Sequence, residues 1–204
     1  MSKIKNVIFD IGNVLVDFDW GSYTHSIFMD EMLIQELDTA IWGDGRWDRL
    51  DWGEDPEIAI QRMIDYAPEY ESEIKLLFSR VGEVLSKREY SHDWIKSLKS
   101  RGYGVYYLSN YSKLVMDANP DVLDFLPLMD GGVFSCNVHL IKPDHKIYRY
   151  IASQYNLVPS ECVFIDDLLQ NVQAAEDCGF HAIQFLTYQQ ARLDLEELLE
   201  EEDE

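Results

Sequence analysis

The fold is decided by the stretch Val7-Ile8-Phe9-Asp10-Ile11-Gly12-Asn13-Val14-Leu15-Val16-Asp17-Phe18-Asp19. Its apolar opening has the pattern of a strand buried on both faces of a parallel sheet. Asp10 comes where that strand would end, and Gly12-Asn13 supply a tight turn immediately after it. Ligands bind open parallel sheets at the carboxyl ends of the strands. Asp10 is therefore placed for chemistry, although an aspartate that merely closes the strand as an Asx turn would look the same.

Strands and helices alternate in the second half of the chain. Short apolar strands are predicted at 105–108, 131–134, 162–165 and 181–186, and helices at 92–100, 112–117, 145–155 and 170–178. Polar residues follow the strands at their carboxyl ends. This rhythm predicts an α/β fold with a doubly wound parallel sheet.

The segment between the first strand and residue 87 has a different character. Apolar residues recur at helical spacing over 23–38 and 55–66, helices continue over 69–87, and no convincing strand is found. Residues 41–53, rich in Trp, Gly and charge, are interpreted as a loop between these helices. We therefore expect a small all-helical cap over residues 19–87, inserted into a core domain made of residues 1–18 and 88–204.

Composition narrows the class of protein and its partners. The 204 residues are 47% hydrophobic, which is ample for a globular core, and carry a net charge of −21. That charge argues against nucleic acid or an anionic membrane as partner. No apolar run is long enough to span a bilayer and no signal peptide is recognised at the start, so a cytoplasmic protein is expected. The acidic run 196–204 is interpreted as a solvated, fraying helix end without function.

Polar side chains stand at four predicted strand ends or loops. They are Asp10; Ser109 with Asn110; Lys142; and Asp166 with Asp167. Taken singly, each has a plain structural explanation as a turn former, a helix cap or a surface residue. Together they match phosphoryl transfer through a covalent aspartyl intermediate. Three acids at one sheet edge would repel one another unless a cation lay among them, and carboxylate oxygens suit Mg²⁺.

The order of these motifs resembles the haloacid dehalogenase superfamily. The matching segments are Phe9-Asp10-Ile11-Gly12-Asn13-Val14-Leu15, Leu108-Ser109-Asn110, Lys142-Pro143-Asp144 and Phe164-Ile165-Asp166-Asp167, with Asn171 to Gly179 continuing the last. The helical insertion stands where that superfamily places its cap. Within it, the Gly12-Asn13-Val14 variant is similar to the bacterial alpha-D-glucose-1-phosphate phosphatase group.

The resemblance implies a role for each motif. Asp10 would be the nucleophile and a Mg²⁺ ligand, together with the backbone carbonyl of Gly12. Asp167 would bind Mg²⁺, with Asp166 bound directly or through water. The remaining roles it implies are that Ser109 and Asn110 hold the transferring phosphoryl group, that Lys142 bridges Asp10 and the phosphate, and that Asn171 supports the site from behind. A Mg²⁺-dependent phosphatase of a small phosphorylated metabolite, such as a sugar phosphate, is expected, acting as a monomer or homodimer.

One position departs from the family pattern. Phosphatases of this superfamily usually carry a second aspartate two residues after the nucleophile, which protonates the leaving oxygen and then activates water. Here that position is Gly12, which cannot transfer a proton. Asp17 and Asp19, close by in sequence, are candidates to replace it. The same gap leaves two other functions open: a metal-independent 2-haloacid dehalogenase, and a binding or regulatory protein that has lost turnover.

The Trp-rich segment of the insertion is the candidate contact to the organic part of a substrate. Trp42, Trp47 and Trp52 could pack on a sugar ring, and Asp51, Arg46 or Arg49 could bond its hydroxyls. Burial between cap helices is the alternative explanation for each tryptophan. The sequence does not decide between them, nor does it say which substrate is used or which acid replaces the missing one.

Overall fold

The computed structural model describes residues 3–200 and contains a parallel sheet with helices on both faces. The strand order is β5 (Gly131–Phe134), β4 (Gly104–Ser109), β1 (Asn6–Phe9), β6 (Cys162–Asp166) and β7 (His181–Gln184), every pair being parallel. The predicted doubly wound α/β fold is confirmed. Ser109 and Asp166 prove to be the last residues of their strands, so their side chains are held by the sheet itself.

Side chains of β1 alternate between two separate apolar clusters, one on each face of the sheet. Ile8 packs in the cluster that contains residues of α9 (His145–Gln154) and α10 (Leu169–Asp177). Val7 and Phe9 pack in the other, with α6 (Ser91–Ser100) and α11 (Tyr188–Glu200). Successive residues of a strand point to opposite faces of the sheet. The run of apolar residues at 7–9 is therefore buried on both faces.

The end of the chain departs in part from its expected behaviour. α11 continues to Glu200, and Leu195 and Leu199 are buried in the core. Glu196 is paired with Arg101 at 2.7 Å. The acidic run is therefore docked through its leucines as far as residue 200, and residues 201–204 lie outside the described part of the chain. The three cysteines are free thiols, and no described helix has the length and apolar character needed to cross a membrane.

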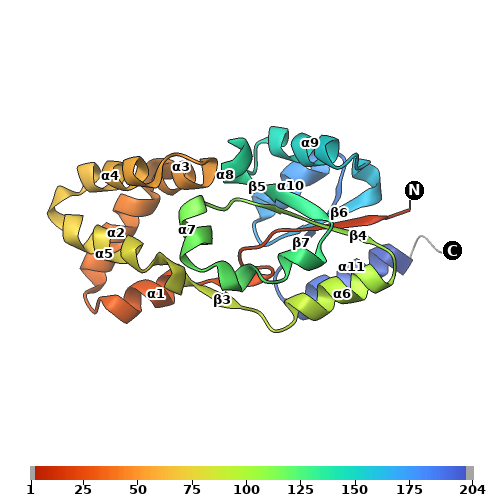
Figure 1. Cartoon of the computed structure of the whole chain (residues 1–204), viewed down its shortest axis with the longest axis horizontal. Coiled ribbons are helices and arrows are strands. Elements are labelled where there is room, and N and C mark those ends of the chain that lie inside the picture. Colours follow the sequence, from red (N-terminus) through yellow and green to blue (C-terminus); the bar gives the residue numbers. More distant parts are fainter. Residues whose placement is uncertain (1–2, 201–204) are drawn as a thin grey trace.

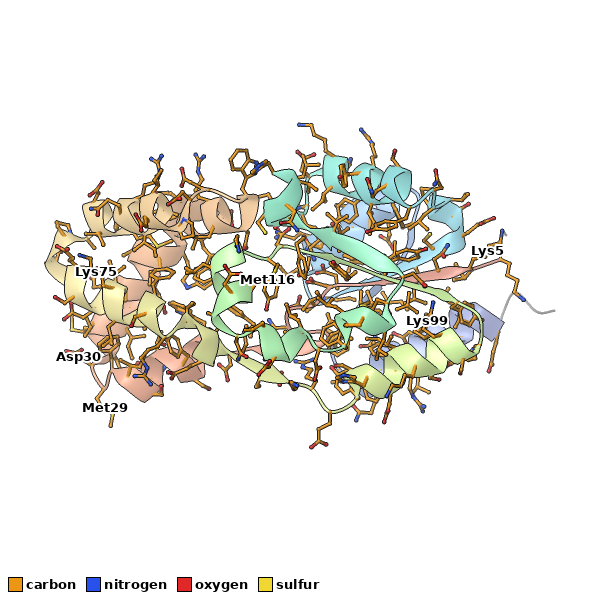
Figure 2. The ribbon with its side chains drawn as sticks, viewed as in Figure 1. Lys5, Met29, Asp30, Lys75, Lys99 and Met116 are labelled. Atoms are coloured by element: carbon orange, nitrogen blue, oxygen red, sulfur yellow. The ribbon has the colours of Figure 1, made fainter. Side chains whose placement is uncertain are left out.

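Five helices of the segment expected to form the cap lie together at one end of the molecule (Figure 1), and we keep the name cap for this segment. They are α1 (Trp20–Ile27), α2 (Glu31–Trp42), α3 (Arg46–Trp52), α4 (Pro56–Tyr66) and α5 (Glu71–Ser79). Met29 and Lys75 lie on the cap side of the molecule, and Lys5 and Lys99 lie toward the opposite end (Figure 2). Trp42, Trp47 and Trp20 pack on one another, with Trp42 and Trp47 stacked at 4.4 Å between ring centroids.

Three predictions for the cap are wrong in detail. The single helix expected over 23–38 is two helices, because Asp30 accepts hydrogen bonds from the backbone N–H groups of Met32 and Leu33 and starts α2. The loop expected over 41–53 contains the helix α3. The insertion also includes a strand: β3 (Leu85–Lys87) pairs antiparallel with β2 (Val16–Phe18). Three-residue strands that pair only with each other are too short to show a period in the sequence.

Short elements complete the chain. They are α7 (Lys113–Ala118), α8 (Ser135–Val138) and 3₁₀ segments at 43–45, 68–70, 81–84, 120–123, 126–128 and 159–161. The cap meets the core where α3 packs against α8 and α7. This contact matters for function because α8 and α7 follow β5 and β4 at the edge of the sheet where the polar residues gather.

Candidate active site

Asp10 leaves the central strand through a turn that the local sequence builds. Its backbone N–H donates to the carbonyl of Ile165 at 2.8 Å, and its Oδ1 accepts from the N–H of Ile11 at 2.7 Å. The Ile11 carbonyl then accepts from three successive N–H groups, those of residues 14–16. Asn13 adopts φ = 57°, a left-handed conformation that asparagine tolerates better than most residues. The turn holds the Asp10 carboxylate at the carboxyl end of the sheet, 7% exposed.

Lys142 joins two of the acids. Its Nζ lies 2.9 Å from Asp10 Oδ1 and 2.6 Å from Asp166 Oδ2, and the residue is 3% exposed. The side chain of Asn110 clamps the Lys142 backbone: Oδ1 accepts from its N–H at 2.8 Å and Nδ2 donates to its carbonyl at 3.0 Å. The amide of Asn110 is thereby committed to positioning Lys142. The Ser109 hydroxyl hydrogen-bonds the Asp10 carboxylate.

The two acids at the end of β6 have different surroundings. Asp166 is fully buried, and its Oδ1 accepts from the N–H of Leu168 at 2.9 Å and from Asn171 Nδ2 at 3.0 Å. Asp167 is partly buried and accepts from Asn13 Nδ2 at 3.4 Å. Asp166 therefore has its hydrogen bonds supplied by protein, whereas Asp167 retains free acceptor capacity.

The charges of the cluster are poorly balanced by protein groups alone. Burial, with a smaller contribution from Asp166, raises the pKa of Asp10 to about 7, although Lys142 opposes the shift. Burial and Asp166 also raise the pKa of Asp167. Burial disfavours the ammonium of Lys142, but Asp10 and Asp166 outweigh it and hold its pKa above the usual range. One lysine thus faces three carboxylates.

These residues fit a magnesium ion. Carboxylate oxygens of Asp10, Asp166 and Asp167 lie within 4.8 Å of one another. Asn171 Oδ1, beside them, is buried and receives no hydrogen bond from any described residue, as expected of an acceptor that serves a water of a hydrated cation. A divalent ion would offset the excess negative charge with the oxygen ligands that Mg²⁺ prefers. The Gly12 carbonyl as a further ligand stays a prediction.

A cavity of about 370 Å³ opens above the cluster. The core lines it with Asp10, Gly12, Asn13, Asn110, Tyr111, Ser112, Val115, Ile141, Lys142, Pro143, Asp167, Leu168, Gln170 and Asn171; Phe18 of β2 and the cap residues Trp42, Trp47, Asp48 and Asp51 complete the lining. Lys142 is the sole Lys, Arg or His among these described lining residues. A phosphate entering the cavity would face several carboxylates, which again calls for a metal cation.

The family is decided by a match over most of the chain. Residues 4–179 match the family model of the haloacid dehalogenase-like hydrolases. The chain belongs to this family. The match begins before β1 and ends after α10, so it includes the four strand-end motifs as well as the inserted cap.

The relatives of this chain include two phosphatases of similar length. Sesquiterpene phosphatase astK of Aspergillus oryzae is 25% identical over 87% of this chain and 88% of its own. D-ribitol-5-phosphate phosphatase of Bacteroides thetaiotaomicron is 24% identical over 89% of this chain and 91% of its own. Drimenol cyclase drtB of Aspergillus calidoustus is 27% identical over 89% of this chain. The matched part is 34% of the length of the cyclase.

Solved structures of the family share the fold. A haloacid dehalogenase-family enzyme from Bacteroides thetaiotaomicron, in complex with magnesium and inorganic phosphate, superposes with a TM-score of 0.73 at 20% identity, covering 92% of this chain and 98% of that one. A dehalogenase with an intermediate complex gives a TM-score of 0.68 at 17% identity, covering 90% and 85%. At these identities the comparison establishes the fold alone.

Several residues of the expected site lie elsewhere in this member of the family. Asp17 is paired with Arg88 at 2.7 Å, and Asp19 caps α1 through the N–H of Ser22. Arg46 donates to the carbonyls of Thr39 and Ala40 at the end of α2. Trp52 packs on His139. Neither these residues nor Arg49 line the cavity, because each is committed to structure or directed elsewhere.

Two residues near the cavity, Ser135 and Tyr111, were not singled out from the sequence. Ser135 is fully buried, and its Oγ accepts from the N–H of Tyr111 at 2.9 Å and donates to the carbonyl of Asp51. Tyr111 lines the cavity, and its hydroxyl is buried with no partner among the described residues. The position of Tyr111, directly after the motif Ser109-Asn110, is the one clue that was present.

Proposed function

We propose that this protein is a Mg²⁺-dependent phosphatase that hydrolyses a small phosphorylated metabolite through an aspartyl-phosphate intermediate on Asp10. One observation carries the proposal: the nearly buried Asp10, paired with Lys142 at 2.9 Å, shares its cavity with an acidic cluster that fits a divalent cation. The phosphatases named among its relatives support the same reaction class.

The residues divide the work as follows. An Asp10 oxygen attacks phosphorus in line with the leaving oxygen, and the ammonium of Lys142 stabilises negative charge on the phosphoryl oxygens. Ser109 orients Asp10 through its hydrogen bond. Asn110 contributes by fixing the Lys142 backbone, so a direct contact from residue 110 to phosphate would come from its backbone N–H. Asp10, Asp167 and Asp166, with the Gly12 carbonyl, would hold Mg²⁺, which would supply positive charge to the transferring group.

The acidic cluster is what favours a phosphatase over a haloacid dehalogenase. A metal-independent reaction on a carboxylate substrate would have to bring an anion toward Asp10, Asp167, Asp48 and Asp51 with Lys142 as the sole lining cation of the described cavity. A binding protein without turnover is disfavoured because Lys142 and Ser109 both contact Asp10, an arrangement that serves a nucleophile.

The organic part of the substrate would lie against the aromatic side of the cavity. Trp42 is partly exposed there and stacks on Trp47, and Phe18 packs edge-on against both. An indole face suits the C–H face of a sugar, so a sugar phosphate is the proposed substrate class. The same aromatic surface, with Val115 and Ile141, would also accept an apolar chain, and an isoprenoid monophosphate is therefore the second candidate.

We further propose that the protein works in the cytoplasm, as a monomer or homodimer, without a nucleic-acid or membrane partner. The net charge of −21 supports this, since it offers no basic surface to phosphate backbones or anionic lipids.

Phosphate release tests the proposal. The purified protein is assayed with sugar phosphates, isoprenoid monophosphates, nucleotides and p-nitrophenyl phosphate, with Mg²⁺ or with chelator, and with a 2-haloacid in parallel. We expect Mg²⁺-dependent release that Asp10→Asn lowers by at least about 1,000-fold without loss of fold, because the amide is no nucleophile. Retained turnover in Asp10→Asn would exclude Asp10, and halide release without metal would establish the dehalogenase.

A further inference from the structure

The proposed reaction needs a proton at the leaving oxygen, and the turn after Asp10 offers no group to give it. Position 12 is a glycine. Asp17 and Asp19, the neighbours in sequence, are held in an ion pair and a helix cap away from the cavity. An alkoxide is a poor leaving group in water, so a phosphatase of alcohol phosphates gains about 100-fold to 10,000-fold from a positioned acid.

Four carboxyl groups line the cavity, and three of them are unsuited to this task. Asp10 is the proposed nucleophile. Asp167 belongs to the proposed metal site. Asp48 is exposed to solvent on the cap. Asp51, one helical turn further along α3, remains. It is partly buried and reaches the same cavity as Asp10 and Lys142.

The core fixes the end of α3 that carries Asp51. The Ser135 hydroxyl donates to the Asp51 carbonyl while it accepts from the N–H of Tyr111, so one buried side chain ties the cap helix to the loop after β4. The next carbonyl, of Trp52, lies 2.9 Å from His139 Nδ1. At Gly53 a Cβ would lie 2.5 Å from the Cys136 carbonyl oxygen, so the chain passes there only as glycine.

The surroundings of the Asp51 carboxyl favour its neutral form near neutral pH. Burial, with smaller contributions from Asp48 on its own helix and Asp10 across the cavity, raises the pKa of Asp51 to about 7, even though Lys142 and the Trp47 side chain oppose the shift. Tyr111 and Cys136, from the loop after β4 and from α8, are the other titratable groups that interact with it. A carboxyl that is protonated in part of the population can both give and take a proton.

A buried donor beside Asp51 also points to a bound ligand. Tyr111 lines the cavity and is 4% exposed, and its buried hydroxyl has no hydrogen-bond partner among the described residues. Buried hydroxyls are rarely left unpaired, because an unmade hydrogen bond is costly. A substrate oxygen placed between Tyr111 and Asp51 would satisfy it.

We propose that Asp51, delivered by the cap, is the proton donor and acceptor of the phosphatase reaction; this rests on the proposed function. Asp10 forms a bond to phosphorus as the P–O bond to the alcohol breaks, and the departing oxygen takes the proton of the Asp51 carboxyl. A water molecule then attacks phosphorus and gives its proton to the Asp51 carboxylate. The bond from Asp10 to phosphorus breaks, and inorganic phosphate leaves with both aspartates restored.

The test compares leaving groups in Asp51→Asn. The probes are D-ribitol 5-phosphate or glucose 1-phosphate, whichever the wild type turns over faster, and p-nitrophenyl phosphate, whose leaving phenolate needs no acid. We expect kcat/KM to fall by about 100-fold or more for the sugar ester and by less than about 3-fold for the aryl ester. A burst of nitrophenol should precede slow turnover, because water attack on the aspartyl phosphate loses its base.

Two further variants sharpen the result. Asp44→Asn, on the cap with a 90% exposed side chain, is the matched control and should leave both rates unchanged. Gly12→Asp adds a carboxyl where a Cβ meets nothing within 4 Å; combined with Asp51→Asn, it should restore the sugar-ester rate. The proposal is overturned if Asp51→Asn lowers both values of kcat/KM equally or leaves the sugar ester unaffected. The aryl-ester rate of the wild type, Mg²⁺-dependent and lost in Asp10→Asn, tests the phosphatase assignment separately.

Discussion

The ammonium of Lys142 lies 2.9 Å from Asp10 Oδ1, and the two side chains are 1% and 10% exposed. A second carboxylate, Asp166, lies 2.6 Å from the same nitrogen. Charges this deeply buried depend on one another, because removal of one leaves the others uncompensated in a medium of low dielectric constant. The ammonium of Lys142, which serves the proposed chemistry, therefore also stabilises the fold.

Lys142→Met should destabilise the protein as well as inactivate it. With the ammonium gone, Asp10 and Asp166 are left as close buried acids, and the free energy of unfolding should fall by about 3 kcal/mol. Urea unfolding of the metal-free protein near pH 8 measures this. Lys146→Met, in the same segment but with a 72% exposed side chain, is the control and should stay within about 0.5 kcal/mol of wild type. Equal stability of Lys142→Met and wild type would contradict the expected dependence.

Asp167→Ala should weaken magnesium binding. Asp167 has free acceptor capacity beside Asp10, so its loss removes a ligand and not merely a supporting contact. The Mg²⁺ concentration that gives half-maximal phosphate release should rise by more than about 100-fold, beyond the range typical of residues that only support a ligand. Asp177→Ala, with a 71% exposed side chain on α10, should leave the titration unchanged. An unaltered Mg²⁺ titration in Asp167→Ala would remove Asp167 from the metal site.

Trp42→Ala should affect binding of the organic part of the substrate. Trp42 lines the cavity on its aromatic side, whereas Trp52, similarly exposed, lies outside it. Loss of the indole contact should raise KM for the best substrate by about 10-fold, equivalent to about 1.4 kcal/mol, while inhibition by inorganic phosphate stays the same. Trp52→Ala should leave KM unchanged. If Trp42→Ala weakens phosphate inhibition as much as substrate binding, the tryptophan acts on the whole site and not on the organic group.

Asp51→Asn should stabilise the metal-free protein at alkaline pH. Burial and the neighbouring carboxylates raise the pKa of Asp51 from 3.8, the ordinary value of an aspartate, to about 7 in the folded protein. Between these values the folded state binds more protons than the unfolded state, so the carboxyl costs increasing stability as pH rises. The difference in unfolding free energy between variant and wild type should grow from less than about 1 kcal/mol at about pH 4 to about 4 kcal/mol at about pH 8. A difference independent of pH would mean that burial does not penalise the Asp51 carboxylate.

The core of the fold and of the site was predictable because its signals are local. Buried strands of a parallel sheet read as short apolar runs, and the residue after each run must lie at the carboxyl edge. Once the strands and their order in the sheet are predicted, Asp10, Ser109 and Asp166 are therefore expected to lie close together. The acids of this edge and Lys142 could be assigned to one site from the sequence, before any distance between them was known.

The cap could not be resolved in the same way. The three-residue break at 28–30, the short helix α3 and the ribbon of β2 and β3 are too brief to establish a period, and tertiary contacts decide them. The sequence suggested Asp17 and Asp19 as replacement acids because they are neighbours of Asp10 along the chain. The structure commits both elsewhere.

What the sequence determined by itself is the sheet, the strand-end motifs and the family to which the chain belongs. Only the tertiary structure decided which part of the cap meets those motifs. Asp51 lies in the cavity because α3 docks on α8 through Ser135 and the close passage at Gly53. The physical reason lies in how each kind of residue is positioned. Backbone pairing positions the strand ends, and the apolar pattern of each strand is enough to predict it. A cap residue is positioned by packing between two surfaces, and each surface is built from several segments of the chain.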